Sequence, residues 1–297
     1  MRILLATDGS VPSQQAESLV ARFHFPSPLK IDLLNVVHIP FSGSWQFDYG
    51  LSLSEYTAEL KTEAEHWIGA EAEQFACMNA DVSSRVAIGD PADEILQAAA
   101  ENGTDLIILG ARNLSRSRRF LLGSVSTHVA KRAPCSVLVV HPSPPTTPES
   151  SFRIVVADDG SASARNALET LAAIQWGPGV EITVLTVTAP PFEHREKSLF
   201  KAREIWEQNR EHAQQELQAA KLKLQETGAE VKTEIFSNDS PADQILDYIE
   251  QVQAQLVVTG DRGRNTMAKL FLGSTSQRVL THASCSVWIV RRRSKED

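Results

Sequence analysis

Cysteine is scarce in this chain of 297 residues, which contains three, and none of them forms a Cys-x-x-Cys pair. Two of the three, Cys135 and Cys285, stand at the start of short apolar runs, as buried structural thiols commonly do. A sparse, odd set of cysteines argues against a disulfide framework and against a cysteine metal cluster. The composition therefore favours reduced thiols and a cytoplasmic location.

Long apolar runs and an excess of positive charge are also missing. No apolar run approaches the roughly 20 residues that a membrane-spanning helix needs, and residues 1–7 are typical of a strand, not of a signal peptide. Acidic residues outnumber basic ones by 37 to 29, which gives a net charge of −8. This balance disfavours nucleic acid and anionic membranes as partners. The basic cluster near the C-terminus, formed by residues 291–293 and 295, is interpreted as a solvated end of the chain.

The common catalytic motifs are absent as well. The sequence has no Gly-Lys-Ser or Gly-Lys-Thr phosphate loop, so it lacks the lysine that normally meets the terminal phosphates of a nucleotide. It has no His-Glu-x-x-His metal motif, and its eight histidines are scattered. These absences argue against efficient catalysis, and no residue is assigned a catalytic or metal-binding role.

What the chain does have is an internal repeat. At an offset of 150 residues the second half repeats Gly260, Gly273, Ser274 and Ser276 of one glycine-rich stretch as Gly110, Gly123, Ser124 and Ser126. At an offset of 151, the stretch from Arg153 to Ser161 repeats the stretch from Arg2 to Ser10. Residues 142, 144, 145 and 148 are prolines, as in a stiff exposed connector. We therefore expect two domains, 1–141 and 152–297, joined by a linker at 142–151.

Each copy alternates short apolar runs with amphipathic segments. In the first copy, strands are expected at 1–7, 31–37, 82–88, 106–109 and 136–140, with helices between them, including a long one at 53–79. Strand–helix alternation predicts a parallel sheet with helices on both faces. Ligands bind such sheets at the carboxyl ends of the strands, where the strand order reverses.

One stretch suggests a binding site at that place. The apolar run Val257-Val258-Thr259 ends at Gly260, a second glycine follows at Gly263, and Gly273 precedes the three hydroxyl residues 274–276. Glycines let a backbone approach an anion closely, and a helix N-terminus offers free N–H groups with partial positive charge. The stretch is therefore a candidate phosphate cradle. The alternative is an ordinary strand–loop–helix crossover in which the glycines only make turns.

The spacing Gly-x-x-Gly, nine residues, then Gly-Ser resembles the ATP-binding signature of the universal stress protein family. Thr7-Asp8-Gly9-Ser10, the Gly-Asp-Pro-Ala turn at 89–92 and the closing strand at 135–140 also resemble that family, and the likeness runs through nearly the whole chain twice. It implies two tandem Rossmann-like, doubly wound domains, each with a five-stranded parallel sheet in the order 3-2-1-4-5. It also implies ATP as ligand, with Mg²⁺ or Mn²⁺ bound through the phosphates.

The resemblance implies a set of nucleotide-binding residues in each copy. In the second copy, Asp159 and the main chain at Val187 would hold the adenine end, and Thr259 and Gly260 would lie beside the adenosine. Gly263, Gly273, Ser274, Thr275 and Ser276 would hold the phosphates, and Arg262 belongs to the same binding set without a more specific role. The matching residues of the first copy are Asp8, Val36, Leu109, Gly110, Arg112, Asn113, Gly123, Ser124, Val125 and Ser126. An open alternative for Asp159 is that its carboxylate only caps the following turn.

The first copy departs from the family pattern at Asn113, which stands where the second glycine belongs. Asparagine tolerates a positive φ better than most residues, so the turn can persist, but its side chain occupies space that a phosphate needs. Arg116, Arg118 and Arg119 follow; they either supply guanidinium donors to a phosphate or form a solvated loop.

The resulting hypothesis is a tandem universal stress protein that binds ATP and acts as a nucleotide-dependent regulatory factor in the stress response, with little or slow hydrolysis. Two alternatives stay open: an ATPase or phosphotransferase that uses the same cradle, and an interaction scaffold that binds no nucleotide. The apolar closing strands, 136–140 and 286–290, predict that the two copies pair as a pseudo-dimer. Homodimerisation is implied by the resemblance, and the regulatory protein partner is unknown.

Overall fold

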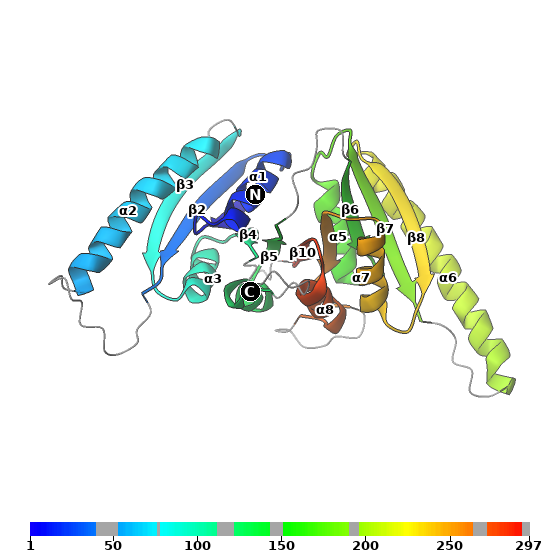
Figure 1. The fold of residues 1–297 in the computed structure, drawn as a ribbon. Coiled ribbons are helices and arrows are strands. Elements are labelled where there is room, and N and C mark those ends of the chain that lie inside the picture. The colour runs from blue at the N-terminus through cyan, green and yellow to red at the C-terminus, as the bar shows by residue number, and fades with distance from the viewer. Residues whose placement is uncertain are drawn as a thin grey trace. The chain divides into compact units, whose positions relative to one another are not determined.

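The computed structural model describes residues 1–39, 53–75, 78–111, 122–142, 151–189, 196–263 and 272–292 (Figure 1). The chain divides into two compact units, the first built mainly from Met1–Arg112 and Gly123–Val140 and the second mainly from His141–Arg292. Each unit alternates strands and helices, and each is described on its own.

Among the described residues, the first unit contains five parallel strands and four helices. β1 pairs with β2 and β4, β2 with β3, and β4 with β5, which gives the order β3-β2-β1-β4-β5. The elements are β1 (Arg2–Ala6), α1 (Val11–Arg22), β2 (Leu29–Val37), α2 (Leu53–Gln74), β3 (Ala80–Ile88), α3 (Pro91–Glu101), β4 (Leu106–Gly110), α4 (Ser124–Arg132) and β5 (Ser136–Val140).

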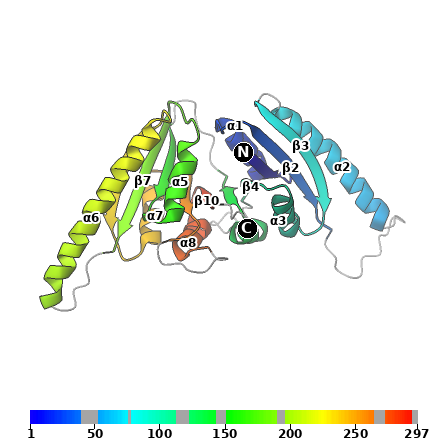
Figure 2. The same ribbon diagram turned by 180° about the vertical axis from the view of Figure 1, so that it is seen from behind.

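The second unit repeats this topology. β6 pairs with β7 and β9, β7 with β8, and β9 with β10. Figure 2 shows the long helix α6 running beside β7 and β8. The elements are β6 (Phe152–Ala157), α5 (Ala162–Ala172), β7 (Val180–Thr188), α6 (Glu196–Gln225), β8 (Glu230–Ser237), α7 (Pro241–Gln251), β9 (Leu256–Gly260), α8 (Ser274–His282) and β10 (Ser286–Val290).

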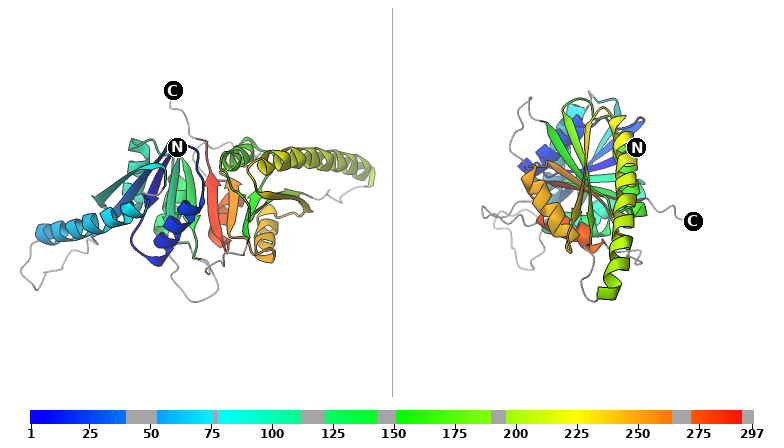
Figure 3. Two further views of the ribbon diagram at one scale, coloured as in Figure 1. Left: turned by 90° about the horizontal axis from the view of Figure 1, so that it is seen from above. Right: turned by 90° about the vertical axis from the view of Figure 1, so that its right-hand side faces the viewer.

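The central strands form the core of each unit because helices cover both faces of the sheet. In the first unit α1 and α2 lie on one face and α3 and α4 on the other (Figure 3). Strands in that position are buried on both sides and carry continuous apolar runs, as Ile3-Leu4-Leu5 and Leu106-Ile107-Ile108 do with no exposed surface. The predicted fold class is confirmed: two tandem doubly wound α/β units.

Among the described residues, no helix is both long enough and apolar enough to span a membrane.

Candidate functional site

The two ends of the glycine-rich motif meet in the second unit. The amide of Gly273 donates to the carbonyl of Asp261 at 2.8 Å, so the residue that follows β9 lies next to the residue that precedes α8. A Cβ on Gly273 would lie 3.4 Å from the Cα of Arg262 and 3.5 Å from the amide nitrogen of Gly263. Residues 261–263 therefore lie against the N-terminus of α8, where the amides of the first turn have no partner within the helix.

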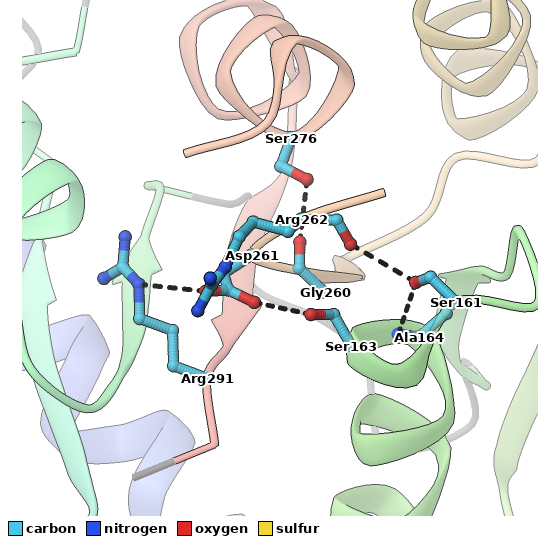
Figure 4. A network of polar contacts seen from close by, with 8 residues as sticks. All are labelled: Ser161, Ser163, Ala164, Gly260, Asp261, Arg262, Ser276 and Arg291. Atoms are coloured by element: carbon cyan, nitrogen blue, oxygen red, sulfur yellow. Dashed lines mark hydrogen bonds and ion pairs between the residues drawn. The ribbon is translucent and has the colours of Figure 1, made fainter. Parts of the chain in front are cut away.

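The three hydroxyl residues at the start of α8 differ in what they can reach. Ser276 is buried, and its hydroxyl donates to the carbonyl of Gly260 at 2.7 Å, which ties α8 to the end of β9 (Figure 4). The hydroxyl proton of Ser276 is therefore donated within the protein and not to a ligand. Ser274 is exposed and Thr275 half-buried, so their hydroxyls are accessible to a ligand. In the first unit the buried Ser126 donates to the carbonyl of Gly123.

The first glycine of the motif has a packing role in both units. A Cβ on Gly260 would lie 2.6 Å from the Cβ of Ser163, and one on Gly110 would lie 2.6 Å from the carbonyl carbon of Pro12. Real Cβ contacts are essentially never that short. Only glycine therefore allows α1 to pack against the end of β4, and α5 against the end of β9. The two glycines are explained without a ligand.

The second glycine of the motif borders the end of the first strand of its unit. A Cβ on Gly263 would lie 2.9 Å from Oδ2 of Asp159, so the carboxyl ends of β6 and β9 share one edge, as expected from the topology. Gly263 is not among the glycines with positive φ. Space beside Asp159, and not a left-handed backbone, is what this position requires.

Asp159 also caps a turn. It is exposed, and its Oδ1 accepts the amide of Ser161 at 3.0 Å. Asp8 does the same in the first unit, where Oδ1 accepts the amide of Ser10 at 3.1 Å and the hydroxyl of Ser13 at 3.2 Å. Both aspartates therefore cap the turn that follows the first strand of their unit, which is the structural role that the sequence left open for Asp159. This role is compatible with a further contact to a ligand.

Asp261 is the residue that the sequence analysis missed. Its side chain is only 8% exposed, Oδ1 accepts the hydroxyl of Ser163 at 2.7 Å, and Oδ2 accepts Nε of Arg262 at 3.0 Å (Figure 4). Nε of Arg291 lies 3.9 Å from the same oxygen. Arg262 is held a second time, because the hydroxyl of Ser161 donates to its carbonyl at 3.2 Å. The signal that could have revealed Asp261 is a difference between the copies: Ala111 stands at its position in the first one.

The remaining predicted residues that the structure describes lie in or near the ends of strands or at the start of α4. Val187 and Val36 are half-buried near the ends of β7 and β2. Thr259 is buried in β9 with 3% of its surface exposed, and its hydroxyl has no hydrogen-bond partner among the described residues. Leu109 is buried in β4, and Gly123, Ser124 and Val125 form the start of α4. The predicted residues Arg112 and Asn113, together with Arg116, Arg118 and Arg119, lie outside the described residues.

The first unit has a different arrangement around its first turn. Thr7 donates to the buried Glu17 at 2.7 Å, and burial, with the nearby Glu71, raises the pKa of Glu17 to about 7. A Cβ on Gly9 would lie 3.1 Å from the ring of Trp67 in α2. In the second unit, Asp158 and Leu168 stand in place of Thr7 and Glu17. Beyond the shared topology, the two sites are therefore built differently.

Thiols and possible metal-ligand clusters are the remaining groups to describe within the part of the chain that the structure covers. No group of three or more His, Cys, Asp or Glu side chains there is close enough to hold a metal ion. Cys135 and Cys285 are buried, and burial raises the pKa of the Cys285 thiol to about 12.

Comparison with known proteins finds the same family in both halves of the chain. The family model described as "Universal stress protein family" matches residues 1–141 and 151–291. A universal stress protein of Mycobacterium tuberculosis is 26% identical, over 98% of this chain and 97% of its own length. A putative universal stress protein of Staphylococcus aureus is 32% identical, over 46% of this chain and 82% of its own length.

Solved structures support the same fold. The crystal structure of a universal stress protein from Archaeoglobus fulgidus superposes with a TM-score of 0.66 at 22% identity and covers 98% of both chains. That of a putative universal stress protein from Pseudomonas aeruginosa superposes with a TM-score of 0.59 at 16% identity, over 98% of this chain and 93% of its own. With a family-model match in each half of its sequence, this chain belongs to the universal stress protein family.

Proposed function

We propose that the second unit binds ATP at the N-terminus of α8 and that the protein acts as a nucleotide-dependent regulatory factor. Membership of the family supports a role in the stress response. The observation that carries the nucleotide proposal is the convergence of residues 261–263 on the first turn of α8, beside Asp159.

The chemistry of this convergence suits a polyphosphate. The first-turn amides of α8, the hydroxyls of Ser274 and Thr275 and the terminal nitrogens of Arg262 are all donors, and phosphate oxygens are acceptors. Gly263 leaves room where a side chain would press on Asp159. Mg²⁺ or Mn²⁺ would be bound through phosphate oxygens and water. Ser276 is left out of the phosphate set, because its proton is donated to Gly260.

The adenosine end would lie against Asp159, Val187 and Thr259. The buried hydroxyl of Thr259 lacks a partner among the described residues, and burying a hydroxyl without a hydrogen bond costs about 1–3 kcal/mol. A nucleoside that hydrogen-bonds to it would remove this cost. Asp159 and Val187 stand at the ends of the neighbouring strands β6 and β7.

Hydrolysis should be slow. Asp159, whose carboxylate lies beside Gly263, accepts an amide proton in its own turn and is assigned by resemblance to the adenine end. The sequence supplies no phosphate-loop lysine to stabilise charge on a transferring phosphoryl group. The enzyme alternative predicts metal-dependent turnover that Gly263→Val together with Ser274→Ala abolishes.

The test is the nucleotide content of protein purified without added ligand, measured by ion-exchange chromatography of the supernatant after denaturation. We expect a single ATP per chain. Gly263→Val should lose it, because the new side chain would collide with the Asp159 carboxylate. Asn113→Val, the matched change in the first copy, should retain it. Protein that carries no nucleotide and binds none on titration with ATP and magnesium would overturn the proposal and favour the scaffold.

A further inference from the structure

Three side chains around the cradle differ together between the two copies. The second unit has Ser163, Asp261 and Arg291, which form one polar cluster through the carboxylate of Asp261. The positions that match them in the first copy hold Pro12, Ala111 and His141. A hydroxyl donor, a buried anion and a cation are thus replaced as a set.

The first unit shows that the fold does not need this cluster. There, the start of α1 approaches the end of β4 as closely as α5 approaches β9, with Pro12 against Gly110 and Ser163 against Gly260. Apolar replacement of a buried ion pair is often neutral for stability, whereas the loss of one partner is not. The cluster therefore requires an explanation beyond packing.

The contacts of Asp261 give that explanation. The carboxylate of Asp261 accepts a hydrogen bond from Nε of Arg262 and not from the two terminal nitrogens of the guanidinium. These two nitrogens carry the other four N–H donors of the side chain. The Arg262 side chain is 35% exposed, and its backbone lies against the first residues of α8. Two guanidinium groups therefore face the single carboxylate of Asp261 close to the N-terminus of that helix.

We propose that Asp261 is the positioning residue of the cradle: it holds the Arg262 guanidinium so that its terminal nitrogens bind the phosphates of the nucleotide. This inference rests on the proposed function. It also separates the two units, since the first unit has Ala111 in place of this carboxylate and cannot fix an arginine in the same way.

The experiment measures the dissociation constants of ATP and of adenosine for full-length wild-type protein and for variants. Ser163→Pro, Asp261→Ala and Arg291→His are combined, which installs the residues of the first copy. Proline is expected to fit, because Ser163 is the second residue of α5 and Pro12 the second residue of α1. ATP should bind about 10- to 100-fold more weakly, the effect of a lost charge-assisted hydrogen bond, while adenosine binds as before.

A double-mutant cycle shows whether Asp261 acts through Arg262. Asp261→Ala and Arg262→Ala should each weaken ATP binding, and the double variant should lose little more than Arg262→Ala alone. Arg278→Ala is the matched control: it also removes an arginine from this region, but that residue pairs with Asp243 in α7, and the affinity for ATP should hardly change.

Three results would overturn the inference. Equal weakening of ATP and adenosine binding would show that Asp261 only maintains the fold, and unchanged affinities would show that it does nothing for the ligand. Wild-type protein that binds no ATP would remove the proposed function and this inference with it.

Discussion

Glu17 gives the first unit a defined pH dependence. It is 7% exposed, accepts a hydrogen bond from Thr7, and has its pKa raised from 4.5 to about 7, chiefly by burial. Between these two values the folded chain holds a proton that the unfolded chain releases, so stability falls as the pH rises through this window. The contribution is fully present below pH 4.5 and is lost above pH 7.

Glu17→Gln should therefore flatten the pH profile of stability. Relative to this variant, the wild-type free energy of unfolding should fall by about 1–3 kcal/mol between pH 4.5 and pH 8, as measured by urea denaturation. Glu73→Gln, an exposed change on α2, is the control and should leave the profile as it is. Parallel curves for wild type and Glu17→Gln would show that Glu17 titrates like a solvated carboxylate.

At the scale of elements, the apolar patterning predicted the sheets well. Continuous apolar runs such as Ile3-Leu4-Leu5 are unambiguous, because a strand covered on both faces has no polar side. The edge strand β3 begins at Ala80, two residues before the expected start, since its largely exposed residues carry little apolar signal. The strand order came from the family resemblance, because it depends on contacts between segments distant in sequence.

The cradle was predicted less completely, for physical reasons. The spacing of the motif identified the strand end and the helix start, and the structure brings them together through Gly273 and Asp261. The sequence did not reveal that Gly260 is required by Ser163, that Gly263 has no positive φ, or that Ser276 donates to a carbonyl. Each of these depends on which atom of another element lies within about 3 Å, and spacing carries no such information.

The packing role of the first glycine predicts equal damage in both units. Gly110→Ala and Gly260→Ala each place a Cβ within 2.6 Å of the start of a helix, so α1 or α5 must shift outward. We expect each variant to lose about 1–3 kcal/mol in urea denaturation, as overpacked cores do. Gly69→Ala in α2 is the matched control: its Cβ meets nothing within 4 Å, and alanine should add about 0.5–1 kcal/mol of stability. A loss confined to Gly260→Ala would instead point to a role in ligand binding.

At the scale of the whole molecule, pairing of the closing strands β5 and β10 stays a prediction. Within its own unit β5 pairs with β4 and β10 pairs with β9, and each strand consists of apolar residues after its first serine. An apolar edge left open would template aggregation, so we expect the two edges to pair within one chain or between chains. Hydrogen exchange should then be slow along both strands, and sedimentation would distinguish the two cases. Rapid exchange at alternate amides of both strands would contradict the pairing.

The two units should also respond differently to nucleotide. Asn113 occupies the place of Gly263, where a side chain would meet the carboxylate that follows the first strand, and Ala111 replaces Asp261. On addition of ATP and magnesium to the full chain, hydrogen exchange should slow in the segment from β9 to α8 and stay unchanged from β4 to α4. The triple variant Pro12→Ser, Ala111→Asp and Asn113→Gly should show slower exchange from β4 to α4 when ATP is added. Asn113→Gly removes the side chain that fills the space of Gly263, and the other two changes supply the carboxylate and the hydroxyl found in the second unit. Protection of both units in the wild-type protein would show that the first copy binds nucleotide without either feature.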